Sequence, residues 1–583
     1  MRWNTIRFTR ERLGCISVLV RKVKTKIPVK VCAMSLLRRS AIALLSANIL
    51  LATAALADKD AGDLERKVDM LFAAYDQRNS PGCALGVVRD GEFIYKRGYG
   101  AASLELGVPL TSQSVFYMGS VSKQFTAASV VLAAEQGFLS LDDDVRKYVP
   151  ELPSYGKTIT LRDMLHHTSG LRDILFLLNL AGRNVEDIHS TSELIDMLSR
   201  QEALNFSPGE GYQYSNSNYF LMSVVIHRAT GKTLSLFAEE NIFNPLGMTH
   251  TRFYEDHTLV VPGRIPAYEP REGGGFRVDW STNFDKVGDG GLMSSVEDLL
   301  SWDRNFYDNK LGKGTLLKEM QTRGVLNNGK QIEYALGLMI NTYRGLPTVA
   351  HGGALFGYRT ELLRFPEQKF SVICLCNLGT SDPGRLADQV ADIYLDKQFP
   401  PAQAAAAATP VHVDGQPFAG LYRDLESHSV YKISAADGDL VLFGQHLKAL
   451  GPTRFSFSPG PELLFEAQAN GGMRVTVTSP DTPPQVFERY EPIKPSVEDL
   501  AQYAGEYASG ELQTTYRFAV KDGKLAVTTN WREPFVLEPG VRDEFQGANG
   551  TTFVFRRDAV GHIIACDLFA YTVRNISLTR TAK

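Results

Sequence analysis

Ser120 and Lys123 are the residues whose types and spacing best suit nucleophilic catalysis. They stand at the start of an apolar stretch that predicts a helix over residues 120–136. Side chains three residues apart on a helix share a face. A serine hydroxyl is a weak nucleophile until a neighbour takes its proton, and a lysine whose charged form is disfavoured by burial can take it. Because Ser-x-x-Lys also arises by chance, the pair taken alone fits an N-cap serine with a surface lysine better.

Two further segments carry side chains suited to proton transfer and substrate binding. Tyr214 and Asn216 stand in a turn-rich stretch just before a predicted helix, where a phenol can shuttle protons and an amide can orient a lysine. His351 opens the run His351-Gly352-Gly353, in which the imidazole can supply a positive or hydrogen-bonding group and the glycines admit a substrate backbone. Taken alone, each segment fits a plainer structure better: a packed tyrosine with Asn216 as N-cap, and a tight turn with a half-buried His351.

Together, in the order Ser-x-x-Lys, Tyr-x-Asn and His-x-Gly, the segments resemble the penicillin-recognising serine hydrolases. This group contains class C β-lactamases, D-alanyl-D-alanine carboxypeptidases, D-aminopeptidases and related esterases. The similarity covers about residues 65–395, with further matching stretches at 161–171, 244–248 and 288–295. It implies that Ser120 attacks a carbonyl and becomes acylated, and that Lys123 and Tyr214 divide the base and acid work.

The resemblance also implies the residues that bind the substrate and its developing negative charge. The backbone N–H groups of Ser120 and Ala354 would form an oxyanion hole, and Asn216 would orient the substrate. We therefore expect the substrate and oxyanion residues to be Asn216, His351, Gly353 and Ala354.

One departure from the family pattern concerns residues 351–353. Many members have Lys-Thr-Gly or His-Thr-Gly where this chain has His-Gly-Gly. The threonine hydroxyl helps to bind a substrate carboxylate, so its absence weighs against efficient β-lactamase or carboxypeptidase activity. The overall plan is most similar to the D-aminopeptidases, which need a free amino group and in which a C-terminal domain restricts substrate size.

The elements that must position these residues indicate an α+β fold. Hairpins are predicted at residues 82–97, turning at Asp90-Gly91, and at residues 360–377, turning near Pro366. Helices lie between them, including one over residues 216–230 that Gly231 ends. We expect an antiparallel sheet flanked by helices, with a helical subdomain, of the β-lactamase/transpeptidase type over residues 58–399.

The C-terminal part contains an internal repeat. Phe418-Ala-Gly-Leu-Tyr422 recurs as Tyr503-Ala-Gly-Glu-Tyr507, and Asp437-Gly-Asp-Leu440 recurs as Asp522-Gly-Lys-Leu525. Both pairs have the same offset, which favours duplication. We predict an Ala/Pro-rich linker at 400–412 followed by two small all-β, barrel-like domains at 413–493 and 494–583.

The N-terminus resembles a targeting segment. Arg38 and Arg39 precede a small and apolar run that ends in Ala55-Leu56-Ala57, as in a secretory signal peptide. We expect residues 1–57 to be an extension with a signal peptide cleaved after Ala57, translation to begin at Met34, and the mature protein to be periplasmic or secreted. The alternative is an uncleaved membrane anchor.

Composition excludes several other functions. The chain has 583 residues, 44% of them hydrophobic, and a net charge of −3. Residues 1–57 hold eleven Lys or Arg and one acidic residue, whereas the remainder holds 51 basic and 64 acidic residues, so an acidic body argues against nucleic-acid binding. Without Cys-x-x-Cys or His-Glu-x-x-His, we expect no metal and no other cofactor. We expect Cys374 and Cys376, on one face of a strand, to pack in the core.

The hypothesis is therefore an exported serine hydrolase that forms an acyl-enzyme on Ser120 and cleaves small amides or peptides, as a D-aminopeptidase or D-Ala-D-Ala carboxypeptidase does. Its partner would be a small-molecule or peptide substrate, with no stable membrane span after cleavage of the leader, and homo-oligomer formation is left open. An esterase or β-lactamase with the same chemistry is the first alternative. A non-catalytic envelope-binding protein is the second.

Overall fold

The computed structural model describes residues 61–279, 285–400, 413–436, 438–457, 460–469, 471–479, 484–529, 533–547 and 550–581. The predicted leader at 1–57 and nearly all of the predicted linker at 400–412 lie outside the described residues. Contacts within the chain separate residues 1–66 from residues 67–583, and all the elements that concern the site belong to the second of these units.

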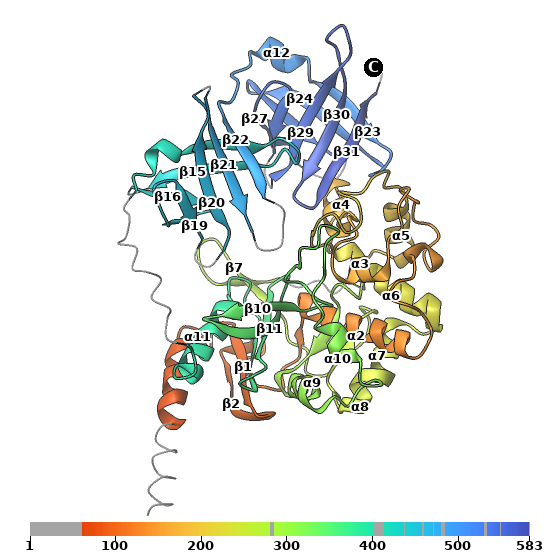
Figure 1. Ribbon diagram of the computed structural model, residues 1–583, viewed down its shortest axis with the longest axis vertical. Helices are drawn as coiled ribbons and strands as arrows, with labels where there is room; N and C mark the ends of the chain where they lie inside the picture. The colour runs from red at the N-terminus through yellow and green to blue at the C-terminus, as the bar shows by residue number, and fades with distance from the viewer. Residues whose placement is uncertain are drawn as a thin grey trace, which may run out of the picture. The chain divides into compact units, whose positions relative to one another are not determined.

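A six-stranded antiparallel sheet forms the centre of the N-terminal half (Figure 1). In spatial order its strands are β10 (Met339–Tyr343), β11 (Leu346–Leu355), β12 (Tyr358–Phe365), β13 (Phe370–Cys376), β1 (Cys83–Arg89) and β2 (Glu92–Tyr99). Asp90 and Gly91 both have positive φ, 52° and 78°, between β1 and β2, which is the backbone of a type I′ hairpin turn. Both predicted hairpins are present.

Helices cover both faces of this sheet. Every residue of β13 is buried, because successive side chains point to opposite faces and each face has its own core. Val372 and Cys374 pack with α11 (Pro383–Leu395), whereas Ile373 and Leu375 belong to the core that contains residues of α9 (Val296–Asp308). Residues 372–376 of the strand are therefore all apolar, without the alternation of a strand that has one exposed face.

A group of helices lies between β2 and β10 in the sequence. The group comprises α2 (Ser122–Glu135), α3 (Leu161–Leu165), α4 (Ile174–Leu180), α5 (Thr191–Ser199), α6 (Asn216–Thr230), α7 (Leu234–Ala238), α8 (Asn244–Leu246) and α10 (Leu316–Met320), besides α9. Gly231, with φ 74°, ends α6 as predicted. The α+β prediction for this half, a helix-flanked antiparallel sheet with a helical subdomain, is confirmed. In the part of the chain that the structure describes, no helix is long and apolar enough to span a membrane.

Short connecting elements complete this half. They are the turns of 3₁₀ helix η1 (Gly119–Val121) and η2 (Val145–Lys147), the π-helical turn η3 (Glu239–Phe243), and the short strands β3 (Ala101–Ser103), β4 (Val108–Pro109), β5 (Phe116–Tyr117), β6 (Arg252–Phe253), β7 (Tyr268–Pro270), β8 (Phe276–Val278) and β9 (Leu292–Ser294). Two of them, η1 and β9, flank the site described below.

The C-terminal half contains two nine-stranded, nearly closed antiparallel sheets of the same strand order, as the repeat predicts. The first follows η4 (Gln416–Phe418) and comprises β14 (Gly420–Asp424), β15 (Val430–Ala436), β16 (Asp439–Leu442), β17 (Gln445–His446), β18 (Lys448–Ala449), β19 (Arg454–Ser456), β20 (Glu462–Ala467), β21 (Met473–Thr478) and β22 (Gln485–Tyr490). The second follows α12 (Val497–Ala501) and comprises β23 (Gly505–Ser509), β24 (Thr514–Lys521), β25 (Lys524–Thr528), β26 (Phe535–Val536), β27 (Glu538–Pro539), β28 (Glu544–Gln546), β29 (Thr552–Arg557), β30 (Ile563–Ala570) and β31 (Val573–Arg580).

The repeated sequence performs the same structural task in both sheets. The Tyr422 hydroxyl donates a hydrogen bond of 2.8 Å to the Phe418 carbonyl, and the Tyr507 hydroxyl donates one of 3.0 Å to the Tyr503 carbonyl. Each tyrosine is completely buried. The recurring motif thus closes an equivalent corner at the start of each sheet.

A disulfide joins two neighbouring strands of the six-stranded sheet. Cys83 of β1 and Cys376 of β13 are bonded, 293 residues apart in the sequence. The expectation that Cys374 and Cys376 share a face is confirmed, since their sulfur atoms lie 3.9 Å apart. The expectation that both only pack is wrong for Cys376, because Cys83 lies directly opposite it in the ladder; Cys374 is a buried free thiol.

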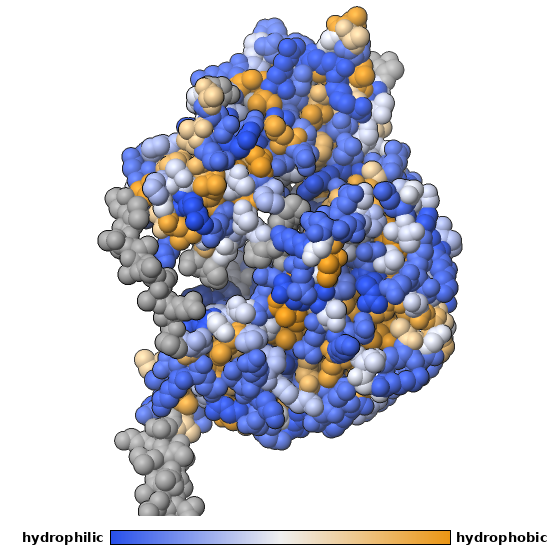
Figure 2. Space-filling view, viewed as in Figure 1, coloured by the Kyte–Doolittle hydropathy of each residue, from blue (hydrophilic) through white to orange (hydrophobic). Residues whose placement is uncertain are grey.

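Hydrophilic residues cover most of the face seen in Figure 2, and hydrophobic residues are scattered between them. The large apolar side chains are gathered instead in the cores of the two halves. The distribution is that of a protein whose apolar residues are used mainly for its own packing.

Candidate active site

Ser120 and Lys123 lie together at the start of α2. Ser120 is the middle residue of η1, which leads directly into α2. The Lys123 side chain is fully buried, and its Nζ lies 3.1 Å from Ser120 Oγ. Nearly every residue of α2 is buried, so the alternative of a surface lysine is excluded. The structure holds the amine within hydrogen-bonding distance of the hydroxyl that it would activate.

The Lys123 amine also donates hydrogen bonds to two oxygen atoms other than Ser120 Oγ. Nζ donates 2.9 Å to Asn216 Oδ1 and 2.6 Å to the carbonyl oxygen of Asp289. Burial lowers the pKa of Lys123 to about 7, with Asp289 and Asp173 opposing this effect and Lys286 reinforcing it. A lysine with such a pKa is neutral in a substantial fraction of molecules near neutral pH, which a general base must be.

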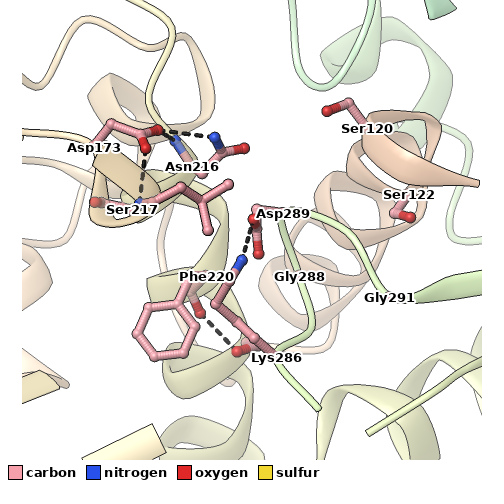
Figure 3. Close-up of polar contacts among 12 residues, drawn as sticks. Ser120, Ser122, Asp173, Asn216, Ser217, Phe220, Lys286, Gly288, Asp289 and Gly291 are labelled. Atoms are coloured by element: carbon pink, nitrogen blue, oxygen red, sulfur yellow. Dashed lines mark hydrogen bonds and ion pairs between the residues drawn. The ribbon is translucent and has the colours of Figure 1, made fainter. Parts of the chain in front are cut away.

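Asn216 is oriented by a carboxylate that the sequence did not single out. Asn216 is the first residue of α6, and the N-cap of that helix is Ser215. The alternative role of Asn216 as a plain N-cap is therefore wrong. Asp173 Oδ2 accepts hydrogen bonds from both the backbone N–H and the Nδ2 of Asn216, the second at 2.9 Å. Because Nδ2 is used in this way, Oδ1 faces the lysine. Figure 3 shows Asn216 and Ser120 facing one another from different elements.

Asp173 is buried and also caps α4. Its Oδ1 accepts hydrogen bonds from Leu175 N, 2.9 Å away, and Phe176 N, 3.2 Å away. Burial raises its pKa, and the Asn216 N–H counteracts that effect. One carboxylate therefore fixes the start of both α4 and α6. Its signal in the sequence was only its place after the stretch at 161–171, because the partner that reveals its role is distant in the chain.

Tyr214 closes the site on the side of α6. Lys123 Nζ lies 4.7 Å from the centre of its ring, which contacts the ring of His167 with centroids 4.3 Å apart. The phenol makes no hydrogen bond of good geometry within the described residues. Ser120 is nevertheless near enough to lower the pKa of Tyr214 against the effect of burial. Burial holds the pKa of Tyr214 well above its ordinary value, so the phenol is protonated near neutral pH.

His351 supports the site as a neutral side chain. Burial and the nearby Lys123 lower its pKa to about 4, so of the two roles predicted for it, a positive or a hydrogen-bonding group, a neutral ring near neutral pH favours the second. Nδ1 lies 2.6 Å from the Gly352 carbonyl oxygen and Nε2 lies 2.9 Å from the Tyr334 hydroxyl. Nδ1 therefore carries the proton and Nε2 accepts from Tyr334. Both ring nitrogens are engaged within the protein.

The glycines of β11 allow this strand to approach Ser120. A Cβ added to Gly353 would lie 2.1 Å from the Met118 carbonyl oxygen and 3.0 Å from Ser120 N, and one added to Gly119 would lie 2.7 Å from Ala354 N. Real Cβ atoms do not make such contacts with backbone, so glycine is required at both positions. The backbone N–H groups of Ser120 and Ala354, the expected oxyanion donors, consequently lie in one neighbourhood.

There is little space for a side chain at Gly352, where many family members have threonine. A Cβ at this position would lie 2.8 Å from Oε2 of Glu361, the residue opposite it on β12. A carboxyl group thus occupies the space into which a threonine side chain would begin.

The turn between β30 and β31 reaches residues that adjoin the site. The Tyr571 carbonyl accepts 2.9 Å from Gln213 Nε2, next to Tyr214, and the Thr572 carbonyl accepts 2.9 Å from Asn205 Nδ2. Arg172, next to Asp173, forms a buried ion pair with Glu511, with side chains 1% and 4% exposed. The second β sheet is therefore bonded to the loops that carry Tyr214 and Asp173.

Comparisons with known proteins agree with this geometry. Residues 64–395 match the family model described as Beta-lactamase. A D-aminopeptidase of Gluconobacter oxydans is 27% identical over 78% of this chain and 84% of its own length. Penicillin-binding protein 4* of Bacillus subtilis is 30% identical over 54% of this chain and 71% of its own length.

A solved structure has the same fold across most of the chain. It is the octameric penicillin-binding protein homologue from Pyrococcus abyssi, with a TM-score of 0.51, 22% identity, and coverage of 82% of this chain and 99% of that one. The chain belongs to the Beta-lactamase family. It is a serine hydrolase of that family, similar to enzymes named D-aminopeptidase and to penicillin-binding proteins.

Proposed function

We propose that this protein is an exported serine hydrolase that forms an acyl-enzyme on Ser120 and cleaves small amides or peptides with D-residues. The observation that carries the proposal is the 3.1 Å separation of Lys123 Nζ and Ser120 Oγ in a site where burial lowers the pKa of Lys123 to about 7. The family gives the class of reaction, and the roles of individual residues follow from their geometry.

Lys123 acts as the general base. A neutral amine has two N–H groups and one lone pair. Asn216 Oδ1 and the Asp289 carbonyl take the two N–H groups, which leaves the lone pair for the Ser120 proton. Oγ then attacks the substrate carbonyl, and the N–H groups of Ser120 and Ala354 stabilise the oxyanion.

Tyr214 carries the proton to the leaving group. Because its pKa is raised, the phenol acts as a donor: it gives its proton to the leaving amine as the C–N bond breaks and regains one from Lys123. A water molecule then attacks the ester on Ser120 by the reverse path, which releases the acid product and returns the proton to Ser120.

The preference for a substrate with a free amino group rests on three observations. The relatives named D-aminopeptidase match most of the chain. Residue 352 is a glycine and lacks the hydroxyl that, in the family pattern, serves a substrate carboxylate. The turn at Tyr571 and Thr572 is bonded beside Tyr214, where it would limit the size of the substrate.

Export is supported by the disulfide between Cys83 and Cys376, since such bonds persist mainly in oxidising compartments. The leader-like sequence at residues 1–57 agrees with it. Fractionation of producing cells, with N-terminal sequencing of the product, tests this part; mature protein that begins at Asp58 in the periplasm or medium is expected, and full-length cytoplasmic protein would contradict it.

A substrate panel tests the choice of substrate. D-alanine p-nitroanilide should be hydrolysed more efficiently than nitrocefin or p-nitrophenyl butyrate. No turnover of the anilide would contradict a D-aminopeptidase, and turnover of the ester or of nitrocefin alone would establish the esterase or β-lactamase alternative. A folded protein that turns over none of them and does not react with a fluorophosphonate would support the envelope-binding alternative.

A further inference from the structure

A buried ion pair lies beside the site, and the mechanism above does not use its charges. Lys286 Nζ and Asp289 Oδ2 are in contact, and their side chains are only 3% and 4% exposed. Figure 3 shows the pair on the turn that passes from residue 286 to Gly291, below Asn216 and Ser120. Taking two charges out of water is expensive, and an apolar pair of similar volume often does as well. Stability alone is therefore a weak reason for the pair.

The backbone of this turn is docked on the start of α2 at several points. The Asp289 carbonyl accepts from Lys123 Nζ at 2.6 Å, and the Gly288 carbonyl accepts from Thr126 Oγ1 at 2.7 Å. On the far side of the turn, Leu292 N donates 3.1 Å to Ser122 Oγ. Three residues of α2 are thus hydrogen-bonded to this turn, and one of them is the proposed base.

We propose that Lys286 and Asp289 are positioning residues for Lys123: their ion pair holds the turn so that the Asp289 carbonyl receives one N–H of the amine, and their opposite charges offset one another beside it. This inference rests on the proposed role of Lys123 as a base. Neither residue needs to touch the substrate.

The two charges act on Lys123 in opposite directions. Asp289 raises the pKa of Lys123 and Lys286 lowers it. The other titratable groups that face the amine are the Asp173 carboxylate, the rings of Tyr214 and Tyr219, and the imidazoles of His167 and His351. Of these, the two imidazoles are neutral near neutral pH because their pKa values are lowered, and the two phenols are protonated because theirs are raised. Titration of the imidazoles and phenols therefore does not mask a change in either member of the pair, whereas the pKa of Asp173 is raised mainly by burial and is also raised by Asp289 and lowered by Lys286.

The test is the pH dependence of the rate at which a fluorophosphonate labels Ser120 in the full protein. Lys286→Met should move the acid limb of the profile to higher pH by about one unit, and Asp289→Asn should move it to lower pH by about as much. The double variant, which restores neutrality, should return the limb close to that of the parent protein. A structural loosening would instead move both single variants in the same direction or change only the rate.

The exposed ion pair of Lys232 and Glu240, 43% and 42% exposed, provides the matched control. Lys232→Met and Glu240→Gln should leave the profile unchanged. Shifts of equal sign in the two buried variants, or no shift in either, would overturn the proposal. If Lys286→Met does not fold, Asp289→Asn and the double variant still decide the sign. Absence of labelling in the parent protein would contradict the proposed base itself, whereas normal labelling with unshifted variants would contradict only the positioning role.

Discussion

The Asp173 carboxylate holds the amide nitrogen of Asn216 at 2.9 Å, and so turns the amide oxygen toward Lys123. This relationship decides which atoms of the lysine remain for catalysis. With one N–H given to Asn216 and another to the Asp289 carbonyl, the neutral amine can accept a proton only from the direction of Ser120. The site is therefore prepared for one direction of proton transfer before a substrate arrives.

The acid limb of the pH profile should report Lys123. Since burial lowers its pKa to about 7 and only the neutral amine is a base, kcat/KM should fall tenfold per pH unit below about 7 and level off above it. His351, with a pKa of about 4, should not contribute in that range. Steady-state rates from pH 5 to 9 measure this, and a kcat/KM that stays constant from pH 5 to 7 would contradict it.

Removal of the Tyr214 hydroxyl should lower kcat more than it raises KM. Tyr214→Phe keeps the ring beside Lys123 and His167 but removes the proton donor, so we expect a loss of about 10²- to 10⁴-fold in kcat. Tyr155→Phe is the matched control, because that hydroxyl is also buried without a hydrogen-bond partner within the described residues. A Tyr214→Phe variant within twofold of the parent in kcat would exclude the phenol from proton transfer.

The buried pair of Arg172 and Glu511 should contribute to stability. Glu511→Met leaves Arg172 uncompensated, which we expect to cost about 3–5 kcal/mol. Glu462→Met removes the exposed partner of Arg454, the two being 48% and 54% exposed, and should cost at most about 1 kcal/mol. Denaturant unfolding measures the free energy of unfolding of both variants. Equal losses would show that the buried pair contributes no more to stability than the exposed pair.

The disulfide should be visible in the count of reactive thiols. Residues 58–583 contain four cysteines, of which Cys83 and Cys376 are bonded and Cys374 and Cys566 are free. Alkylation of the unfolded mature protein should add two groups without reductant and four after reduction. Reduction should also lower the free energy of unfolding by about 2–5 kcal/mol. Four additions without reductant would contradict the bond and weaken the case for export.

Much of the local structure could be predicted because the signals are local. The Asp90-Gly91 turn and the Gly231 end of α6 depend on residues that tolerate positive φ, and a short stretch of sequence shows both. The repeated motif around Tyr422 and Tyr507 predicted two equivalent sheets, because each copy is a short stretch that can be recognised in the sequence. Helical spacing predicted that Ser120 and Lys123 share a face, but the pair alone did not predict that Lys123 is buried.

The parts of the site that could not be predicted depend on contacts between distant segments. Asp173 reaches Asn216 across 43 residues, and Lys123 reaches the Asp289 carbonyl across 166. No spacing rule links such residues before the fold is known. The sequence likewise left open whether His351 is charged, because its pKa is set by burial and by Lys123 rather than by the His-Gly-Gly sequence.

The most direct test of the central claim is the intact mass of the folded protein after treatment with a fluorophosphonate. We expect one covalent adduct, located on Ser120 by peptide mapping, that is absent from Ser120→Ala and formed at least about 10³-fold more slowly in Lys123→Met. The melting temperatures of both variants should confirm that they are folded. An adduct that persists in Ser120→Ala, or an unmodified parent protein under the same conditions, would contradict the account.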